Sequence, residues 1–166
     1  DTEDPIISGI SDGNDADVDW YGSLSTGRII VNVTDNSGIG TYEYSIGSAP
    51  GERDIMNWKL GQDSVGTFSV EGYQEDVVYY ANARATDRVG FVSETVSSDG
   101  FKMDYTLPSA GTVTTNNDFQ SDTTSMTFNW SGFTDEHSGM DKYDVMIGLS
   151  EGADDIAPRQ ATGSLE

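Results

Sequence analysis

Cysteine is absent from this 166-residue chain, and histidine occurs only once, as His137. The first absence excludes a disulfide framework, which a small secreted eukaryotic domain would often carry, and so favours an exported bacterial protein. A serine–histidine–aspartate catalytic set would depend on His137, which falls in a turn. Metal-type histidine spacing and a glycine-rich phosphate loop are missing too. We therefore expect a protein that is not an enzyme.

Basic residues are scarce as well, because 8 lysines and arginines stand against 29 aspartates and glutamates, for a formal net charge of −21. Such a surface repels the phosphates of nucleic acids and of anionic lipids, so neither is an expected partner. The sequence has no run of 18 apolar residues, so no membrane-spanning helix is predicted. An acidic surface suits an exterior rich in salt or calcium, and we expect a secreted or cell-surface protein.

What the sequence does contain is a repeat. The segment 37–47 recurs as 138–148, with the Ser-Gly pair, a tyrosine and the Ile-Gly pair each displaced by 101 positions. A fixed period marks duplicated structural units. A unit of about 100 residues has the usual size of an immunoglobulin-like (Ig-like) sandwich. The repeat predicts one complete module over residues 1–105 and a partial second repeat, the first half of a module, over residues 106–166.

Alternation of apolar and polar residues indicates β-strands along most of the chain. The predicted strands are 6–10, 28–33, 41–46, 58–60, 67–70, 77–85, 91–96 and a last one around 101–105 in the first module, and 126–130 and 142–147 in the second. Because no stretch shows a sustained helical period, the pattern predicts an all-β fold of packed antiparallel sheets. The expected core residues are Ile29, Val31, Tyr44, Ile46, Tyr80 and Ala83.

Two segments resemble a known family of domains. Residues 79–90 combine an aromatic pair, alternating small apolar residues and the pattern Ala-x-Asp-x-x-Gly. They resemble the penultimate strand and turn of fibronectin type III domains and related bacterial Ig-like domains. Residues 126–130 are similar to the second strand of the same fold, which carries a tryptophan, here Trp130. In the first module Val33 stands where that tryptophan would be, so we expect another residue, Trp58, to fill the core.

The resemblance implies tandem antiparallel Ig-like or fibronectin III-like β-sandwiches, the second incomplete. Repeats of this kind occur in large secreted or surface-anchored proteins, and the implied function is a stalk, spacer or adhesion module. The expected partners are other modules of the same protein or another protein chain. The half-module would leave one apolar face and two strand edges open. We expect Phe128 and Trp130 on this face to be covered by a neighbouring chain or by the first module.

The acidic run 12–19 is the strongest candidate for a binding site, with Asp12, Asp15, Asp17 and Asp19 as the predicted ligands. Carboxylates at alternate positions can converge on one hard cation that prefers six to eight oxygens, so the run predicts a calcium site. It is not an EF-hand loop, because the required glycine and the final glutamate are missing. The alternative is a solvated acidic loop between strands. The matching stretch of the second module has lost most of these acids.

A second pair of acids lies near the boundary between the two modules. Asp99 and Asp104 could share a cation with neighbouring loop acids and stiffen the protein there, again with calcium as the expected ion. The alternative is that both are ordinary surface acids, as most exposed carboxylates are.

Trp20, Tyr21 and Trp58 are candidates for sugar binding, because exposed aromatic rings can stack on sugars. They would make the chain a carbohydrate-binding or accessory module of a secreted polysaccharide-active enzyme, with a cell-surface glycan as its partner. The alternative, which we favour, is that these rings pack in the core. Two or more coplanar, exposed rings on one face would distinguish a sugar-binding module from a spacer.

Overall fold

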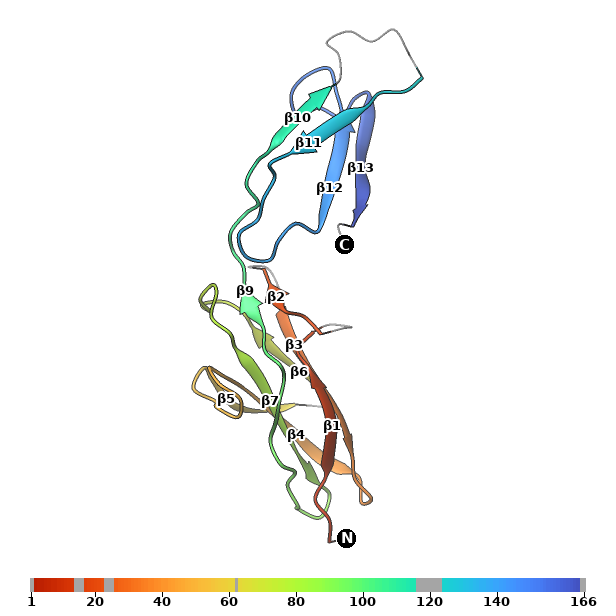
Figure 1. The fold of residues 1–166 in the computed structure, drawn as a ribbon. Helices are drawn as coiled ribbons and strands as arrows, with labels where there is room; N and C mark the ends of the chain where they lie inside the picture. Colours follow the sequence, from red (N-terminus) through yellow and green to blue (C-terminus); the bar gives the residue numbers. More distant parts are fainter. Residues whose placement is uncertain (1, 14–16, 23–25, 62, 116–123, 165–166) are drawn as a thin grey trace. The chain divides into compact units, whose positions relative to one another are not determined.

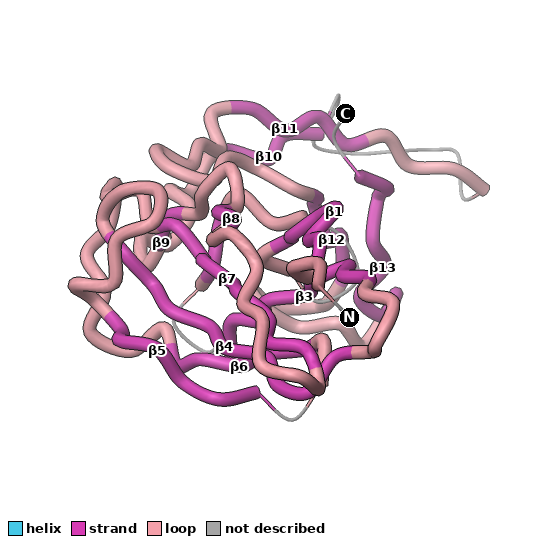
Figure 2. Tube along the Cα trace, turned by 90° about the horizontal axis from the view of Figure 1, so that it is seen from below, coloured by secondary structure: helices cyan, strands magenta, loops and turns pink. Residues whose placement is uncertain are grey.

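The computed structural model describes residues 2–13, 17–22, 26–61, 63–115 and 124–164. The regular structure in these ranges is β-strand, and no helix occurs among them (Figure 1, Figure 2). The predicted all-β class is therefore confirmed. The described residues also contain no helix long and apolar enough to cross a membrane. The chain divides into two compact units, Asp1–Tyr105 and Thr106–Glu166, which we describe separately.

Two antiparallel sheets form the first unit, with the strand orders β1-β3-β6 and β5-β4-β7-β8. Their strands are β1 (Ile6–Ser11), β3 (Thr26–Thr34), β4 (Ile39–Gly47), β5 (Met56–Gly61), β6 (Val65–Ser69), β7 (Tyr80–Asp87) and β8 (Val96–Ser97). A short parallel pair, β2 (Trp20–Tyr21) with β9 (Lys102–Met103), joins two segments that are far apart in the sequence. The predicted strand 91–96 is wrong over most of its length, because only its last residue belongs to a strand.

The buried faces of both sheets meet in one hydrophobic core, an arrangement consistent with a β-sandwich. Ile29 and Val31 on β3 and Tyr44 and Ile46 on β4 are all at most 4% exposed. Successive side chains of a strand point to opposite faces, so this burial confirms the predicted orientation of both strands.

The two core residues predicted at β7, Tyr80 and Ala83, lie on opposite faces of the strand. Tyr79 is 4% exposed, whereas Tyr80, which the alternation predicts in the core, is only partly buried. The odd-numbered residues Ala81, Ala83 and Ala85 face the core. The prediction for Ala83 is therefore confirmed and that for Tyr80 is wrong. Two adjacent tyrosines give no signal for which ring points inward.

Aromatic rings from three separate segments form the centre of the core. The ring centroid of buried Phe101 lies 5.3 Å from those of Tyr21 and Phe68. Trp58, expected in this core, instead lies partly buried on β5, an edge strand, with the Arg84 guanidinium carbon 4.6 Å from its ring centre. The expectation that Trp58 fills the core is therefore wrong.

Gly27 on β3 leaves room for the ring of Phe68. A Cβ added at Gly27 would lie 2.1 Å from Phe68 Cζ, and this ring is only 3% exposed, so it cannot turn out into solvent. We expect Gly27→Ala to lower the free energy of unfolding by about 1–3 kcal/mol, the usual cost of overpacking, as measured by urea denaturation. Gly9→Ala is the matched control, because its Cβ would meet only Asn32 Nδ2, at 3.5 Å. Equal destabilisation by both variants would contradict this packing.

The Ala-x-Asp-x-x-Gly pattern has a local physical cause. Asp87 Oδ1 accepts hydrogen bonds from the backbone N–H groups of Val89, Gly90 and Phe91, at 2.9, 2.5 and 2.8 Å. Burial raises the pKa of Asp87, but these hydrogen bonds outweigh it and hold the pKa below its usual value. Gly90 has a φ of +108°, a backbone conformation that favours glycine. The pattern therefore specifies the turn that follows β7.

The second unit consists of two antiparallel strand pairs. They are β10 (Thr112–Thr115) with β11 (Phe128–Ser131), and β12 (Lys142–Ile147) with β13 (Ala157–Ser164). The predicted strand 142–147 is confirmed at both ends, and 126–130 overlaps β11. Alternation gives no indication of β10, whose four residues are all exposed, or of β13.

The repeat in the sequence extends to single hydrogen bonds. Three bonds at the turn between β4 and β5 recur between β12 and β13, with every residue displaced by 101 positions. They are Glu52 N to Ala49 O (3.0 Å), Ile55 N to Ile46 O (3.2 Å) and Ser48 N to Asp54 Oδ1 (2.9 Å), and then Ala153 N to Ser150 O (3.0 Å), Ile156 N to Ile147 O (3.0 Å) and Leu149 N to Asp155 Oδ1 (3.0 Å). The two hairpins therefore share one local structure.

The Ile-Gly pair of the repeat also has a structural cause. A Cβ at Gly47 would lie 2.3 Å from the carbonyl oxygen of Glu52, and a Cβ at Gly148 would lie 2.3 Å from that of Ala153. Backbone atoms cannot give way as a flexible side chain can. Each glycine therefore allows the turn to pass close to the end of its strand.

Candidate cation site in the first unit

The parallel pair β2–β9 brings the two predicted groups of acids together (Figure 1). Lys102 N donates to the carbonyl oxygen of Asp19 at 2.8 Å, and Asp104 N donates to that of Tyr21 at 2.9 Å. The run 12–19 therefore lies against the segment that follows β8. These groups are about 80 residues apart in the sequence, and the pairing of β2 with β9 and the packing of β1 against β8 bring them together.

Three aspartates form a cluster at this place. Asp12 follows β1, Asp17 precedes β2 and Asp99 follows β8, and one carboxylate oxygen from each lies within 4.8 Å of the other two. Asp12 is buried, whereas Asp17 and Asp99 are exposed. The cluster thus combines two acids of the predicted run with one acid of the second predicted pair.

Asp12 is an unusual residue for the interior of a domain. It is 0% exposed, and neither carboxylate oxygen has a hydrogen-bond partner among the described residues. Burial raises the pKa of Asp12 to about 6, and the nearby charges of Asp17 and Asp99 act in the same direction. The Ser98 side chain opposes this rise without reaching a standard hydrogen-bond geometry. The protein itself therefore leaves this carboxylate uncompensated.

The other predicted ligands lie elsewhere. Asp15 falls outside the described residues. Asp19 is exposed and Asp104 is partly buried, and neither belongs to the cluster, although both take part in the backbone pairing of β2 with β9. The cluster offers carboxylate oxygens only, which suits a hard cation rather than a metal that prefers nitrogen or sulfur ligands.

The three candidate sugar-binding rings do not form one exposed platform. Tyr21 is only 4% exposed, and its hydroxyl donates to the carbonyl oxygen of Asp12, so its ring is not accessible to a sugar. Trp20 lies on β2 with Lys102 Nζ 5.1 Å from its ring centre, and Trp58 lies on β5 below Arg84. One face of each indole thus already contacts a cation, and the two rings belong to different sheets.

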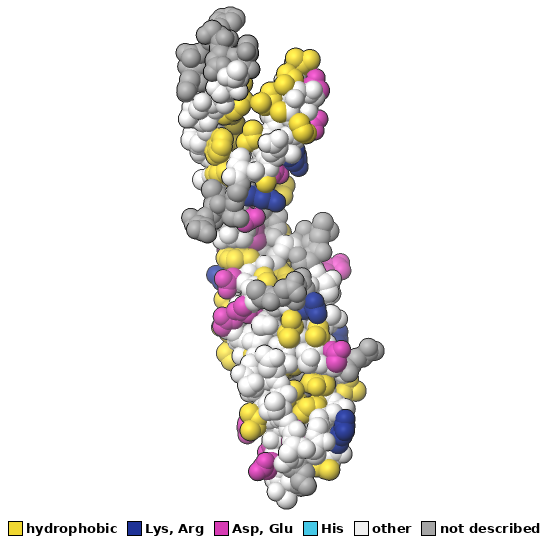
Figure 3. All heavy atoms as spheres, turned by 90° about the vertical axis from the view of Figure 1, so that its right-hand side faces the viewer, with side chains coloured by type: hydrophobic (Ala, Val, Ile, Leu, Met, Phe, Trp, Pro, Cys, Tyr) yellow, Lys and Arg dark blue, Asp and Glu magenta, His cyan; other side chains and the backbone are white. Residues whose placement is uncertain are grey.

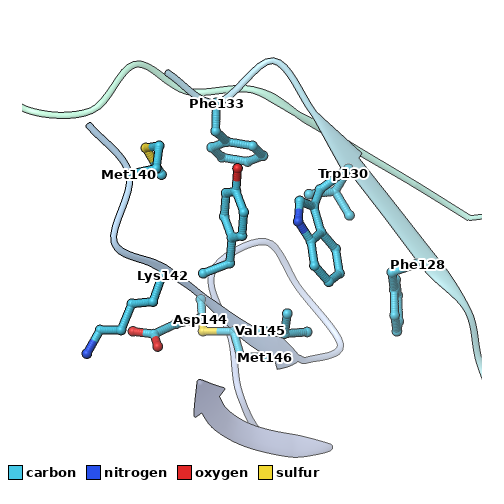
Figure 4. Close-up of a pocket in the computed structure, with 10 residues that line it drawn as sticks. Phe128, Trp130, Phe133, Met140, Lys142, Asp144, Val145 and Met146 are labelled. Carbon is cyan, nitrogen blue, oxygen red and sulfur yellow. The ribbon is translucent and has the colours of Figure 1, made fainter. Parts of the chain in front are cut away.

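A second candidate surface is an apolar hollow of about 370 Å³ in the second unit. Figure 4 shows Phe128 and Trp130 on the same side of β11, and Figure 3 shows hydrophobic side chains at the surface of this unit. The ring centroid of Tyr143 lies 5.6 Å from those of Trp130 and Phe133, yet Trp130 remains 37% exposed. The described residues of the second unit, 106–115 and 124–164, therefore leave this face partly exposed.

The corresponding face of the first unit shows what is missing. There β4 pairs along one edge with β5 and along the other with β7, in a register that puts Tyr44 opposite Ala83. In the second unit, β12 pairs with β13 only, among the described residues. Among the described residues of the second unit, no strand takes the place on the second edge of β12 that β7 takes beside β4.

Comparisons with protein families, with curated proteins and with solved structures find no match to this chain.

Proposed function

We propose that the chain is a non-enzymatic spacer or adhesion segment of a larger secreted or cell-surface protein, a stalk of tandem Ig-like or fibronectin III-like β-sandwiches. In this proposal residues 1–105 are one complete sandwich and residues 106–166 repeat its first half. The observation that carries the proposal is the recurrence of three hairpin hydrogen bonds at a spacing of 101 residues. Serial copies of one small module are typical of proteins that span distance rather than perform chemistry.

Two further features support this function. The net charge of −21 keeps such a segment soluble and extended among cations outside the cell, and it disfavours nucleic acid and anionic lipid as partners. The open face of β12 favours another module of the same protein, or another protein chain, as the partner. A bacterial surface protein fits the absence of cysteine.

Pulling the protein between its ends in a single-molecule force experiment tests the spacer function. We expect the first unit, Asp1–Tyr105, to resist force and then to unfold in one event that releases about 350 Å of chain, as about 105 extended residues would. Unfolding in several weak steps would contradict a load-bearing module.

A glycan array tests the competing function, a carbohydrate-binding module. We expect no saturable glycan binding, because each candidate indole already stacks with a cation. Saturable binding that is lost in both Trp20→Ala and Trp58→Ala would overturn the spacer function in favour of a sugar-binding one. Tyr105→Ala, on an exposed ring outside the candidate set, is the control.

A further inference from the structure

We propose that Asp12, Asp17 and Asp99 bind one calcium ion, with Asp12 as the buried ligand. The cation would join three segments, the chain after β1, the chain before β2 and the chain after β8. This inference goes beyond the spacer function and does not rest on it, because it concerns a binding site of the first unit alone.

The state of Asp12 is the first argument. Buried polar groups in native proteins nearly always have partners, and a buried carboxylate without one is costly. Both oxygens of Asp12 lack a partner among the described residues, and an oxygen of this carboxylate lies within 4.8 Å of an oxygen of each of two further carboxylates. A bound cation would supply the missing partner for both oxygens.

The spacing of the carboxylates is the second argument. Calcium binds oxygens at about 2.3–2.6 Å, so two ligands on opposite sides of the ion lie about 5 Å apart. The three oxygens of the cluster all lie within 4.8 Å of one another and so fit around a single ion. Their like charges repel at this distance unless a cation lies between them.

The ligand set favours calcium over magnesium. Both oxygens of Asp12 are available, which allows the two-oxygen coordination that calcium accepts and regular octahedral magnesium avoids. Asp17 and Asp99 are exposed, so water can complete the shell of six to eight oxygens on the outer side. The hydroxyl of Tyr21 holds the carbonyl group of Asp12 and fixes the buried end of the site.

Terbium luminescence and calorimetry can test the site on the whole chain. Trp20 lines the same hollow as Asp99, so excitation of tryptophan should sensitise a terbium ion bound in the cluster. We expect one sensitised terbium ion per chain, which calcium displaces. Added calcium should also raise the melting temperature of the first unit, because the ion binds the folded state. Asp12→Asn and Asp99→Asn should each weaken calcium binding at least tenfold.

The control separates this site from the general attraction of cations to an acidic surface. Glu94→Gln removes an exposed acid outside the cluster and should leave the calcium affinity unchanged. The proposal is overturned if Glu94→Gln loses as much affinity as Asp12→Asn. It is also overturned if millimolar calcium leaves the melting temperature unchanged, or if magnesium displaces terbium as well as calcium does.

Discussion

Replacing Val31 with aspartate is expected to unfold the first unit. Val31 lies in the middle of β3, is 4% exposed and belongs to the core in which both sheets meet. The new carboxylate would have no basic partner there, and a buried unpaired charge costs several kcal/mol. The whole stability of such a domain is only about 5–15 kcal/mol. Circular dichroism and amide proton NMR should show loss of the folded first unit.

The neighbouring residue offers a matched control for this substitution. Asn32 follows Val31 on the same strand but points outward and is exposed, so Asn32→Asp adds the same charge without burying it. We expect the control to change the free energy of unfolding by no more than about 0.5 kcal/mol, as surface substitutions usually do. A well-folded Val31→Asp protein would mean that the register of β3 is shifted by one residue.

Much of the strand pattern could be predicted because one face of each long strand is buried. Alternation located β3 and β4, and it located β12 to the residue, since a buried face imposes a period of two on the sequence. It failed for β2, which has only two residues, and it gave no sign that β9, which lies within the predicted strand 101–105, pairs in parallel with this distant segment. It also failed to show which ring of the Tyr79–Tyr80 pair is buried. The two side chains point to opposite faces of the strand but are identical, so the sequence gives no alternation between apolar and polar residues there.

The candidate site could be predicted only as acids in two separate groups. Carboxylates at alternate positions are visible in a sequence, but the approach of Asp99 to Asp12 and Asp17 depends on the packing of β1 against β8 and on the pairing of β2 with β9. The burial of Asp12 was not predictable either, because its neighbours Ser11 and Gly13 are not apolar. The signal that distinguishes a ligand from a solvated acid is the lack of a partner in the folded state, which only the structure shows.

The same buried carboxylate gives a second large expected effect, a dependence of stability on pH. The pKa of Asp12 is about 6 in the folded protein and about 3.8 when unfolded, so between these values the folded state binds more protons. Stability from this group is therefore fully present below about pH 4 and is lost as the pH rises through 6. A difference of about two pKa units corresponds to a loss on the order of 3 kcal/mol.

Urea denaturation in chelator at pH 4.5, 6 and 7.5 can measure this loss, with Asp12→Asn separating the effect of one group from those of the other acids. The wild-type protein should become less stable than Asp12→Asn as the pH rises, because the amide carries no charge to bury. Saturating calcium should reverse the order at pH 7.5, since the ion stabilises the ionised carboxylate and has no such ligand in the variant. Parallel pH profiles of stability for the two proteins in chelator would show instead that Asp12 ionises in the folded state without loss of stability. The burial of this carboxylate would then not favour cation binding.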